Sequence, residues 1–226
     1  MMKKLGLPAL AVVMIAGLGL WAAQSPKAPG QSLLPGLTAA AQDAPATTAD
    51  LPAVPDMVLG NADAKVTIIE YASYTCPHCA HFHAEVFKDL KRDYIDTGKV
   101  KFVVREVYFD RYGLWAAMMA RCGGATRYFG IHTMLYDGQK EWAASDDPAT
   151  VIGNIRRIGK TAGMDDATLD VCMQDANMAQ AMLNTYEANA KADNVEGTPT
   201  LIINGVKYSN MDYAELKGLV EAELAK

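Results

Sequence analysis

The chain has 226 residues, 50% of them hydrophobic, which is enough to bury a sizeable core and excludes a chain that is disordered throughout. Its formal net charge is -5 at pH 7, and its Lys and Arg residues form no cluster. Because phosphate binding requires clustered cations, the sequence excludes a nucleic-acid-binding surface.

The N-terminus has the pattern of an export signal. Lys3 and Lys4 precede an uncharged apolar run over residues 5–23, which is typical of a signal peptide or a membrane anchor. The run is long enough to span a bilayer, and cleavage after Ala23 would leave the bulky Trp21 where a small residue is preferred. We interpret residues 1–23 as either a cleaved signal or an anchor, with the rest of the chain on the oxidising side of the membrane.

Residues 24–56 are rich in Ala, Pro, Ser, Thr and Gln and have no apolar periodicity, so they predict a flexible linker. The folded part is expected to begin near Met57 and to continue to Lys226 as one domain, because no second linker or internal repeat interrupts it.

The first part of this domain predicts a parallel βαβ unit. Residues 66–74 and 100–109 are rich in β-branched and aromatic side chains, which is typical of strands. Between them, apolar residues recur at helical spacing from Pro77 to about Tyr94, and Gly98 ends the helix.

Residues 113–193 predict helices throughout. After them, the turn Asn204-Gly205 between two short apolar runs predicts a β-hairpin, and a last helix is expected from about Asp212. The pattern therefore predicts an α/β fold, an open sheet with a helical block inserted at about 113–193.

Two cysteines, Cys76 and Cys79, flank the start of the first predicted helix, at a spacing that allows them to form a disulfide. The N–H groups and the dipole at a helix start stabilise negative charge, so Cys76 is expected to be a thiolate, the attacking and leaving species. Cys79, one turn further along, is expected to be less exposed and to resolve the mixed disulfide formed at Cys76.

The residues between the two cysteines also have expected roles. His78 can add positive charge or a hydrogen bond to the Cys76 sulfur, which would stabilise the reduced form and make the disulfide more oxidising. Pro77 suits the first turn of a helix, where its missing N–H is not needed.

A metal site is the alternative that a Cys-x-x-Cys motif leaves open. A structural zinc site normally needs a second pair of ligands at matching spacing, and the other two cysteines stand alone. His81 and His83 could complete a copper or zinc site with Cys76 and Cys79, although we expect both histidines on the helix surface. We predict no metal and no cofactor, and keep a metal-binding module as the alternative of a different class.

In combination, these motifs resemble the DsbA-like family of bacterial disulfide oxidoreductases. The resemblance is carried by residues 69–79, which end in Cys-Pro-His-Cys, and by residues 197–203, which contain Gly-Thr-Pro-Thr, with helices between them. It covers the whole predicted domain. It implies a thioredoxin-like fold with an inserted helical domain, and a periplasmic enzyme that introduces disulfide bonds into exported proteins.

The resemblance implies roles for three further residues. Pro199 is expected to be a cis proline packed against the sulfurs of Cys76 and Cys79, with Thr198 presenting its backbone to an extended substrate. Glu70 is expected to be buried beneath the active-site helix, near Cys79, with a raised pKa that lets it relay the proton of the second thiol.

The resemblance also implies partners: cysteine-containing exported proteins as substrates, and a DsbB-like membrane protein that re-oxidises the enzyme. The best-known DsbA-like enzymes carry an aliphatic residue before the cis proline, whereas this chain carries Thr198, as many isomerase-type and reductase-type relatives do. An isomerase or reductase kept reduced by a DsbD-like membrane protein therefore remains the nearest alternative.

Cys122 and Cys172 remain. In an exported chain with four cysteines, two of them catalytic, the other two are expected to pair. Closing the loop between them would stabilise the fold by roughly 4 kcal/mol in the chain-entropy estimate. Two separately buried thiols are the alternative.

Overall fold

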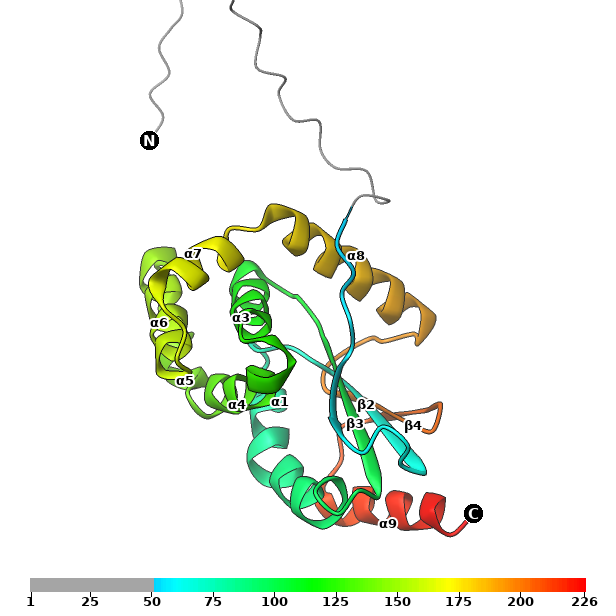
Figure 1. Ribbon diagram of the computed structural model, residues 1–226. Coiled ribbons are helices and arrows are strands. Elements are labelled where there is room, and N and C mark those ends of the chain that lie inside the picture. The colour runs from blue at the N-terminus through cyan, green and yellow to red at the C-terminus, as the bar shows by residue number, and fades with distance from the viewer. Residues whose placement is uncertain (1–50) are drawn as a thin grey trace, which may run out of the picture. The chain divides into compact units, whose positions relative to one another are not determined.

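The computed structural model describes residues 51–226, so the segment expected as a signal or anchor at 1–23, and most of the linker expected at 24–56, lie outside the described residues. The centre of the described part is a five-stranded sheet with the order β1-β3-β2-β4-β5 (Figure 1). Its strands are β1 (Met57–Gly60), β2 (Val66–Ala72), β3 (Val100–Glu106), β4 (Thr200–Ile203) and β5 (Val206–Ser209).

Strands β2 and β3 pair in parallel, which confirms the predicted βαβ unit, and the other neighbouring strands pair antiparallel. Both parallel strands end about two or three residues before the predicted positions. The hairpin of β4 and β5 is also confirmed, and Asn204 and Gly205 both have positive φ, as its two-residue turn requires. The sequence does not predict strand β1, because its four residues are too few to show a clear alternation of side chains.

The predicted helix after β2 is confirmed as one helical segment of four parts. These are α1 (Pro77–Phe82), η2 (His83–Phe87), α2 (Lys88–Leu90) and η3 (Lys91–Ile95), of which η2 and η3 are π-helical. The π-helical turns leave no pattern in the sequence that helical periodicity would detect.

The block predicted at about 113–193 is helical, as expected. Its helices are α3 (Arg111–Cys122), α4 (Gly124–Asp137), α5 (Gln139–Trp142), α6 (Pro148–Thr161), α7 (Asp166–Met173) and α8 (Ala176–Ala192), and α9 (Tyr213–Leu224) follows the hairpin. Figure 1 shows α3 to α7 gathered as one group, and α8 leading from it back to the sheet. An aspartate accepts backbone N–H bonds at the start of α3, α6, α7, α8 and α9, as helix starts favour.

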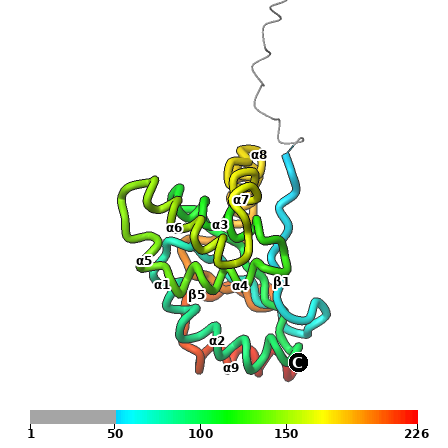
Figure 2. Tube along the Cα trace, turned by 60° about the vertical axis from the view of Figure 1, so that its left-hand side comes forward, coloured from blue at the N-terminus to red at the C-terminus, as the bar shows by residue number. Residues whose placement is uncertain are grey.

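The two faces of the sheet are covered by different helices. In β2, Ile68 belongs to the main core with the helix that follows the strand, and Tyr71 belongs to a smaller cluster that Tyr186 of α8 covers. Helix α9 contacts α2, η2 and β2, and lies beside α2 in Figure 2. Because side chains alternate along a strand, Glu70 lies on the same face as Ile68, toward the helix that carries the two cysteines.

The last residues of the expected linker are not free of the domain. Residues 51–56 form no helix or strand, but Asp56 forms an ion pair with Arg105 at 3.0 Å, and the carbonyl oxygen of Pro55 accepts from Arg121 at 3.0 Å. The packed part therefore begins a few residues before Met57. Among residues 51–226, no helix is both long and apolar enough to cross a membrane.

Candidate active site

Cys76 and Cys79 lie where the chain passes from β2 into α1. Cys76 is the extended residue just before the helix, and Pro77 is the first helical residue. The buried side chain of Gln139 donates to the carbonyl oxygens of Tyr74 and Cys76, at 2.8 and 2.9 Å. The cysteine pair is thereby positioned by the sheet on one side and by the inserted helices on the other.

The surroundings of Cys76 favour its thiolate. A hydrogen bond from the Cys79 thiol is the largest cause that lowers the pKa of Cys76, to about 5, against the opposing effect of burial. The Thr198 side chain and the backbone N–H groups of Cys79 and His78 lower this pKa further. These causes are all hydrogen bonds to the sulfur, which stabilise its charged form.

Cys79 differs from Cys76 in both exposure and acidity. Its exposed fraction is 0%, whereas Cys76 retains 9%, so an incoming thiol can reach only the Cys76 sulfur. Burial, the hydrogen bond to Cys76 and the charge of Glu70 raise the pKa of Cys79 well above its ordinary value. Cys76 is therefore suited to leave as a thiolate, and Cys79 to hold its proton.

Glu70 is a buried carboxyl beneath this pair, with no exposed surface. Burial and then the charge of Cys76 raise the pKa of Glu70 well above its ordinary value. Its Oε2 lies 3.0 Å from Nε2 of His83, and its Oε1 has no partner among the described residues. The charge of Glu70 raises the pKa of Cys79, and the expected proton relay between the two groups remains a prediction.

The segment before β4 lies against the Cys76 sulfur. The peptide bond between Thr198 and Pro199 is cis, and the Cys76 Sγ donates to the carbonyl oxygen of Thr198 at 3.5 Å. The hydroxyl of Thr198 is buried and has no described partner while Cys76 is a thiol. It can donate to the thiolate instead, which agrees with its lowering effect on the pKa of Cys76.

A groove of about 560 Å³ runs past this segment. It is lined by Thr198, Pro199 and His78 and by residues of β5 that include Lys207 and Tyr208. His78 is exposed, and it is the backbone N–H of His78 that lowers the pKa of Cys76. The contribution expected from the imidazole of His78 remains a prediction.

The expectation that both His81 and His83 lie on the helix surface is wrong for His83. His81 is exposed, but His83 has a side chain that is only 6% exposed, bonded to Glu70 and stacked on the ring of Tyr136. His83 follows Cys79 by four residues, a spacing that places both on the same face of a helix. That spacing is the signal in the sequence that could have placed His83 on the buried face of the helix, beside Cys79.

A chain of buried hydrogen bonds continues inward from His83. The Nε2 atoms of His83 and His132 lie 3.2 Å apart, and Nδ1 of His132 lies 2.9 Å from the hydroxyl of Tyr74. Tyr74 donates to the hydroxyl of Tyr128 at 3.2 Å, and Tyr128 donates to Glu106 at 2.9 Å. Sequence reasoning missed these residues, because only the packing of α4 against the sheet brings them together.

The structure does not assemble the metal site considered as an alternative. Within residues 51–226, the ligand atoms close enough to share an ion belong to Glu70, His83 and His132, and neither cysteine is among them. These three side chains hydrogen-bond to one another in sequence, and all are buried. We therefore interpret them as a hydrogen-bonded chain.

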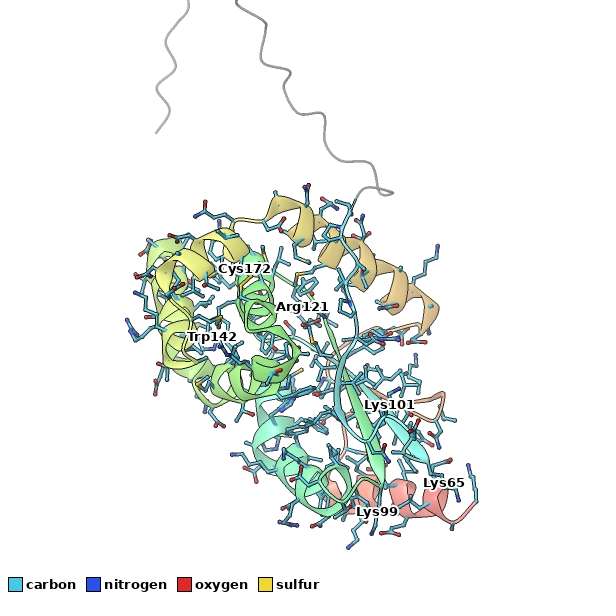
Figure 3. All side chains as sticks on the ribbon, in the orientation of Figure 1. Lys65, Lys99, Lys101, Arg121, Trp142 and Cys172 are labelled. Atoms are coloured by element: carbon cyan, nitrogen blue, oxygen red, sulfur yellow. A yellow bond between two sulfur atoms is a disulfide. The ribbon has the colours of Figure 1, made fainter. Side chains whose placement is uncertain are left out.

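The second cysteine pair lies apart from this site. Cys122 at the end of α3 and Cys172 in α7 are joined by a disulfide, with their Cα atoms 5.8 Å apart (Figure 3). Cys76 and Cys79, by contrast, are free.

Comparison with known proteins defines the class to which this fold and site belong. Residues 53–222 match a family described as thioredoxin, and the chain belongs to that family. Within it, the chain is a DsbA-like member. The predicted thioredoxin-like fold with a helical insertion is thereby confirmed.

Individual relatives agree with this assignment. A candidate protein-disulfide oxidoreductase of Rickettsia conorii is 35% identical over 170 residues, which are 75% of this chain and 60% of the relative. The chain thus spans less than two thirds of the length of that relative. The crystal structure of alpha-DsbA1 from Wolbachia pipientis is similar with a TM-score of 0.71 and 25% identity, over 78% of this chain and 94% of that one.

A third similar protein is the protein-disulfide isomerase from Novosphingobium aromaticivorans. Its crystal structure has a TM-score of 0.66 and 29% identity, over 76% of this chain and 98% of that one.

Proposed function

We propose that this protein is a protein-disulfide oxidoreductase that oxidises pairs of thiols in exported proteins. The observation that carries the proposal is the contrast within one pair, because Cys76 has a pKa of about 5 beside the fully buried Cys79. A stable Cys76 thiolate stabilises the reduced form, and a stabilised reduced form makes the disulfide a stronger oxidant.

The exchange proceeds in two displacements. A substrate thiolate attacks Sγ of Cys76 and breaks the Cys76–Cys79 bond, and Cys79 leaves and takes a proton from Glu70. A second substrate thiolate then attacks the substrate sulfur of the mixed disulfide, and Cys76 leaves as a thiolate. The substrate has gained a disulfide and lost two electrons, and the enzyme has gained them.

The groove beside Thr198 and Pro199 is the proposed place for the substrate peptide. An extended peptide can pair with backbone groups there, which would make recognition tolerant of side chains. A DsbB-like membrane protein is the proposed partner that re-oxidises Cys76 and Cys79.

An extracytoplasmic, periplasmic location is part of the proposal. The Lys3, Lys4 and 5–23 pattern supports export, as a cleaved signal or as an anchor. The disulfide between Cys122 and Cys172 supports it independently, because such bonds persist in oxidising compartments.

An isomerase or reductase kept reduced by a DsbD-like protein is the second candidate. The hydroxyl of Thr198 beside Cys76 favours it, since relatives of those types often carry threonine there. The Novosphingobium aromaticivorans relative is named as a protein-disulfide isomerase, which also favours it.

The reduction potential of the Cys76–Cys79 pair separates the oxidase from the reductase. Equilibration with a series of glutathione redox buffers, followed by alkylation and mass analysis, measures it. A potential near that of glutathione, about −240 mV, or above supports the oxidase, and a potential near that of thioredoxin, about −270 mV, or below supports the reductase.

A further inference from the structure

We propose that His83 carries protons between Glu70 and solvent, through a pocket separate from the substrate groove. The inference rests on the proposed exchange at Cys76 and Cys79, and it names the route by which the buried carboxyl stays in proton equilibrium with water. His83 acts through Glu70 and does not touch the sulfurs.

Glu70 needs such a route because it is sealed. Its side chain has no exposed surface, and its one described hydrogen-bond partner is Nε2 of His83, at 3.0 Å. Burial and the Cys76 thiolate favour its protonated form in the reduced enzyme. Glu70 must therefore lose that proton before it can accept the proton of Cys79, and must regain one after each substrate is oxidised.

His83 connects this sealed carboxyl to the outside. It lines a pocket of about 270 Å³ together with Phe87, Tyr136 and residues that include Lys88 and Asp137. The ammonium of Lys88 and the carboxylate of Asp137 lie 3.6 Å apart, and both side chains are more than half exposed, so the pocket communicates with solvent. Neither Glu70 nor Cys79 lines this pocket, and it shares no residue with the groove beside Pro199.

The second ring nitrogen of His83 is available for this exchange. Its Nδ1 forms no hydrogen bond among residues 51–226. In this part of the chain, the buried side-chain atoms without a hydrogen-bond partner are Oε1 of Glu70 and Oγ1 of Thr198, and Nδ1 is not among them. Because His83 lines the pocket and its Nε2 faces the carboxyl, we assign the contact with solvent to Nδ1.

The chemistry of a neutral imidazole suits the task. Nε2 accepts a proton from Glu70 while Nδ1 releases its own proton to water, and the ring is left as the other tautomer. In the inward direction Nε2 donates to the Glu70 carboxylate and Nδ1 accepts from water, which restores the first tautomer. One proton out and one proton in per redox cycle thus returns His83 to its starting state.

A competing route leads from His83 through His132 and Tyr74 toward Glu106. That route ends at the ion pair of Glu106 with Arg121, whose side chains are only 3% and 9% exposed. The pocket that Glu106 and Arg121 line holds only about 10 Å³, against about 270 Å³ beside His83, so we assign the exchange with solvent to the pocket beside His83.

The test follows the lifetime of a mixed disulfide. Reduced full-length enzyme is mixed with oxidised glutathione, quenched with acid at intervals, and analysed by mass for the glutathione adduct at Cys76. In His83→Gln the adduct should form at the wild-type rate but resolve about tenfold or more slowly, since removal of a general acid–base group costs at least that much. In His83→Ala, added imidazole should enter the enlarged pocket and restore the resolution rate.

The controls separate this role from structure and from the proposed exchange. His81→Gln makes the same change at an exposed position of the same helical segment, and should resolve at the wild-type rate with or without imidazole. Wild-type resolution in both His83 variants, or failure of imidazole to restore His83→Ala, would overturn the role of His83. So would a greater loss in His132→Gln than in His83→Gln. If the glutathione adduct of the wild-type enzyme never formed or never resolved, that result would contradict the proposed exchange at Cys76 and Cys79 itself.

Discussion

The two cysteine pairs of this protein show how sequence separation and surroundings assign different tasks to the same bond. Cys76 and Cys79 are three residues apart and free; Cys76 retains 9% exposure, whereas Cys79 has none. Cys122 and Cys172 are 50 residues apart and closed into a disulfide between two helices. A short loop gains about half the chain-entropy stabilisation of the long one, so the short bond suits exchange and the long one suits stability.

The largest expected effect comes from removing one thiol of the reactive pair. Cys76→Ser should abolish exchange, because no other thiol is exposed to an incoming disulfide. Cys79→Ser should instead accumulate mixed disulfides at Cys76, because the resolving thiol is gone. Non-reducing gels of the reduced enzyme mixed with a scrambled, disulfide-bonded protein would check both. Full turnover in Cys79→Ser would contradict the assigned roles.

Removing the second cysteine pair should lower the stability of the fold and leave the exchange activity unchanged. The double change Cys122→Ala and Cys172→Ala should lower the free energy of unfolding by about 4 kcal/mol, because the loop between them is long. Exchange at Cys76 should be unchanged, since the disulfide lies apart from the site. Urea unfolding without reductant, alongside a peptide oxidation assay, measures the two effects. An unchanged urea midpoint would mean that the disulfide does not constrain the unfolded chain.

The acidity of the reactive pair should appear in a pH titration. The thiolate absorbance of the reduced enzyme should rise with a midpoint near pH 5 from Cys76, and Cys79 should add nothing up to about pH 8.5, the ordinary range of a thiol. Cys79→Ala should raise the titration midpoint of Cys76, because the hydrogen bond from Cys79 is the largest cause of the low pKa of Cys76.

The same acidity links stability to pH. The folded pKa of Cys76 is below the unfolded value of about 8.5, so its thiolate stabilises the reduced fold fully above that pH. The contribution is lost as the pH falls through about 5. Thermal unfolding of reduced and oxidised enzyme should therefore converge toward low pH, and a difference that grew on acidification would contradict the assignment.

The sequence predicts most of the fold because its signals are local. The β-branched and aromatic residues at 66–74, the helical spacing from Pro77 and the turn Asn204-Gly205 are each signals carried by neighbouring residues, and each is confirmed. Strand β1 has only four residues and depends on pairing with β3 for its existence. A signal that needs a partner distant in the chain is not readable from the segment alone.

The active site divides in the same way. The positions of Cys76 and Cys79 at a helix start follow from adjacent residues, whereas the environment of His83 depends on α4, about fifty residues later in the chain. A histidine two positions from the exposed His81 was predicted to be exposed also. The hydrogen bonds of His83 to Glu70 and His132 offset its burial, which hydrophobic patterning does not represent.

The smallest expected effect comes from removing the hydroxyl of Thr198, which contributes to the difference in pKa between Cys76 and Cys79. That hydroxyl is buried without a described partner while Cys76 is a thiol, and its donation to the thiolate helps to lower the pKa of Cys76. Thr198→Val keeps the shape and the backbone carbonyl that accepts from Cys76, and removes only the donor. The pKa of Cys76 should rise by about one unit or less, the worth of one hydrogen bond, and the reduction potential should fall accordingly.

Thr198→Ser is the matched control, because it retains a hydroxyl at the same position and should leave the midpoint near 5. Stability offers an independent check, since a buried donor without a partner costs free energy in the form in which Cys76 is a thiol. Thr198→Val should therefore unfold at an equal or higher urea concentration than the wild type below pH 5, where the thiol form predominates. If valine and serine shifted the titration of Cys76 equally, the hydroxyl would have no part in it, and the backbone N–H groups and Cys79 would account for the low pKa alone.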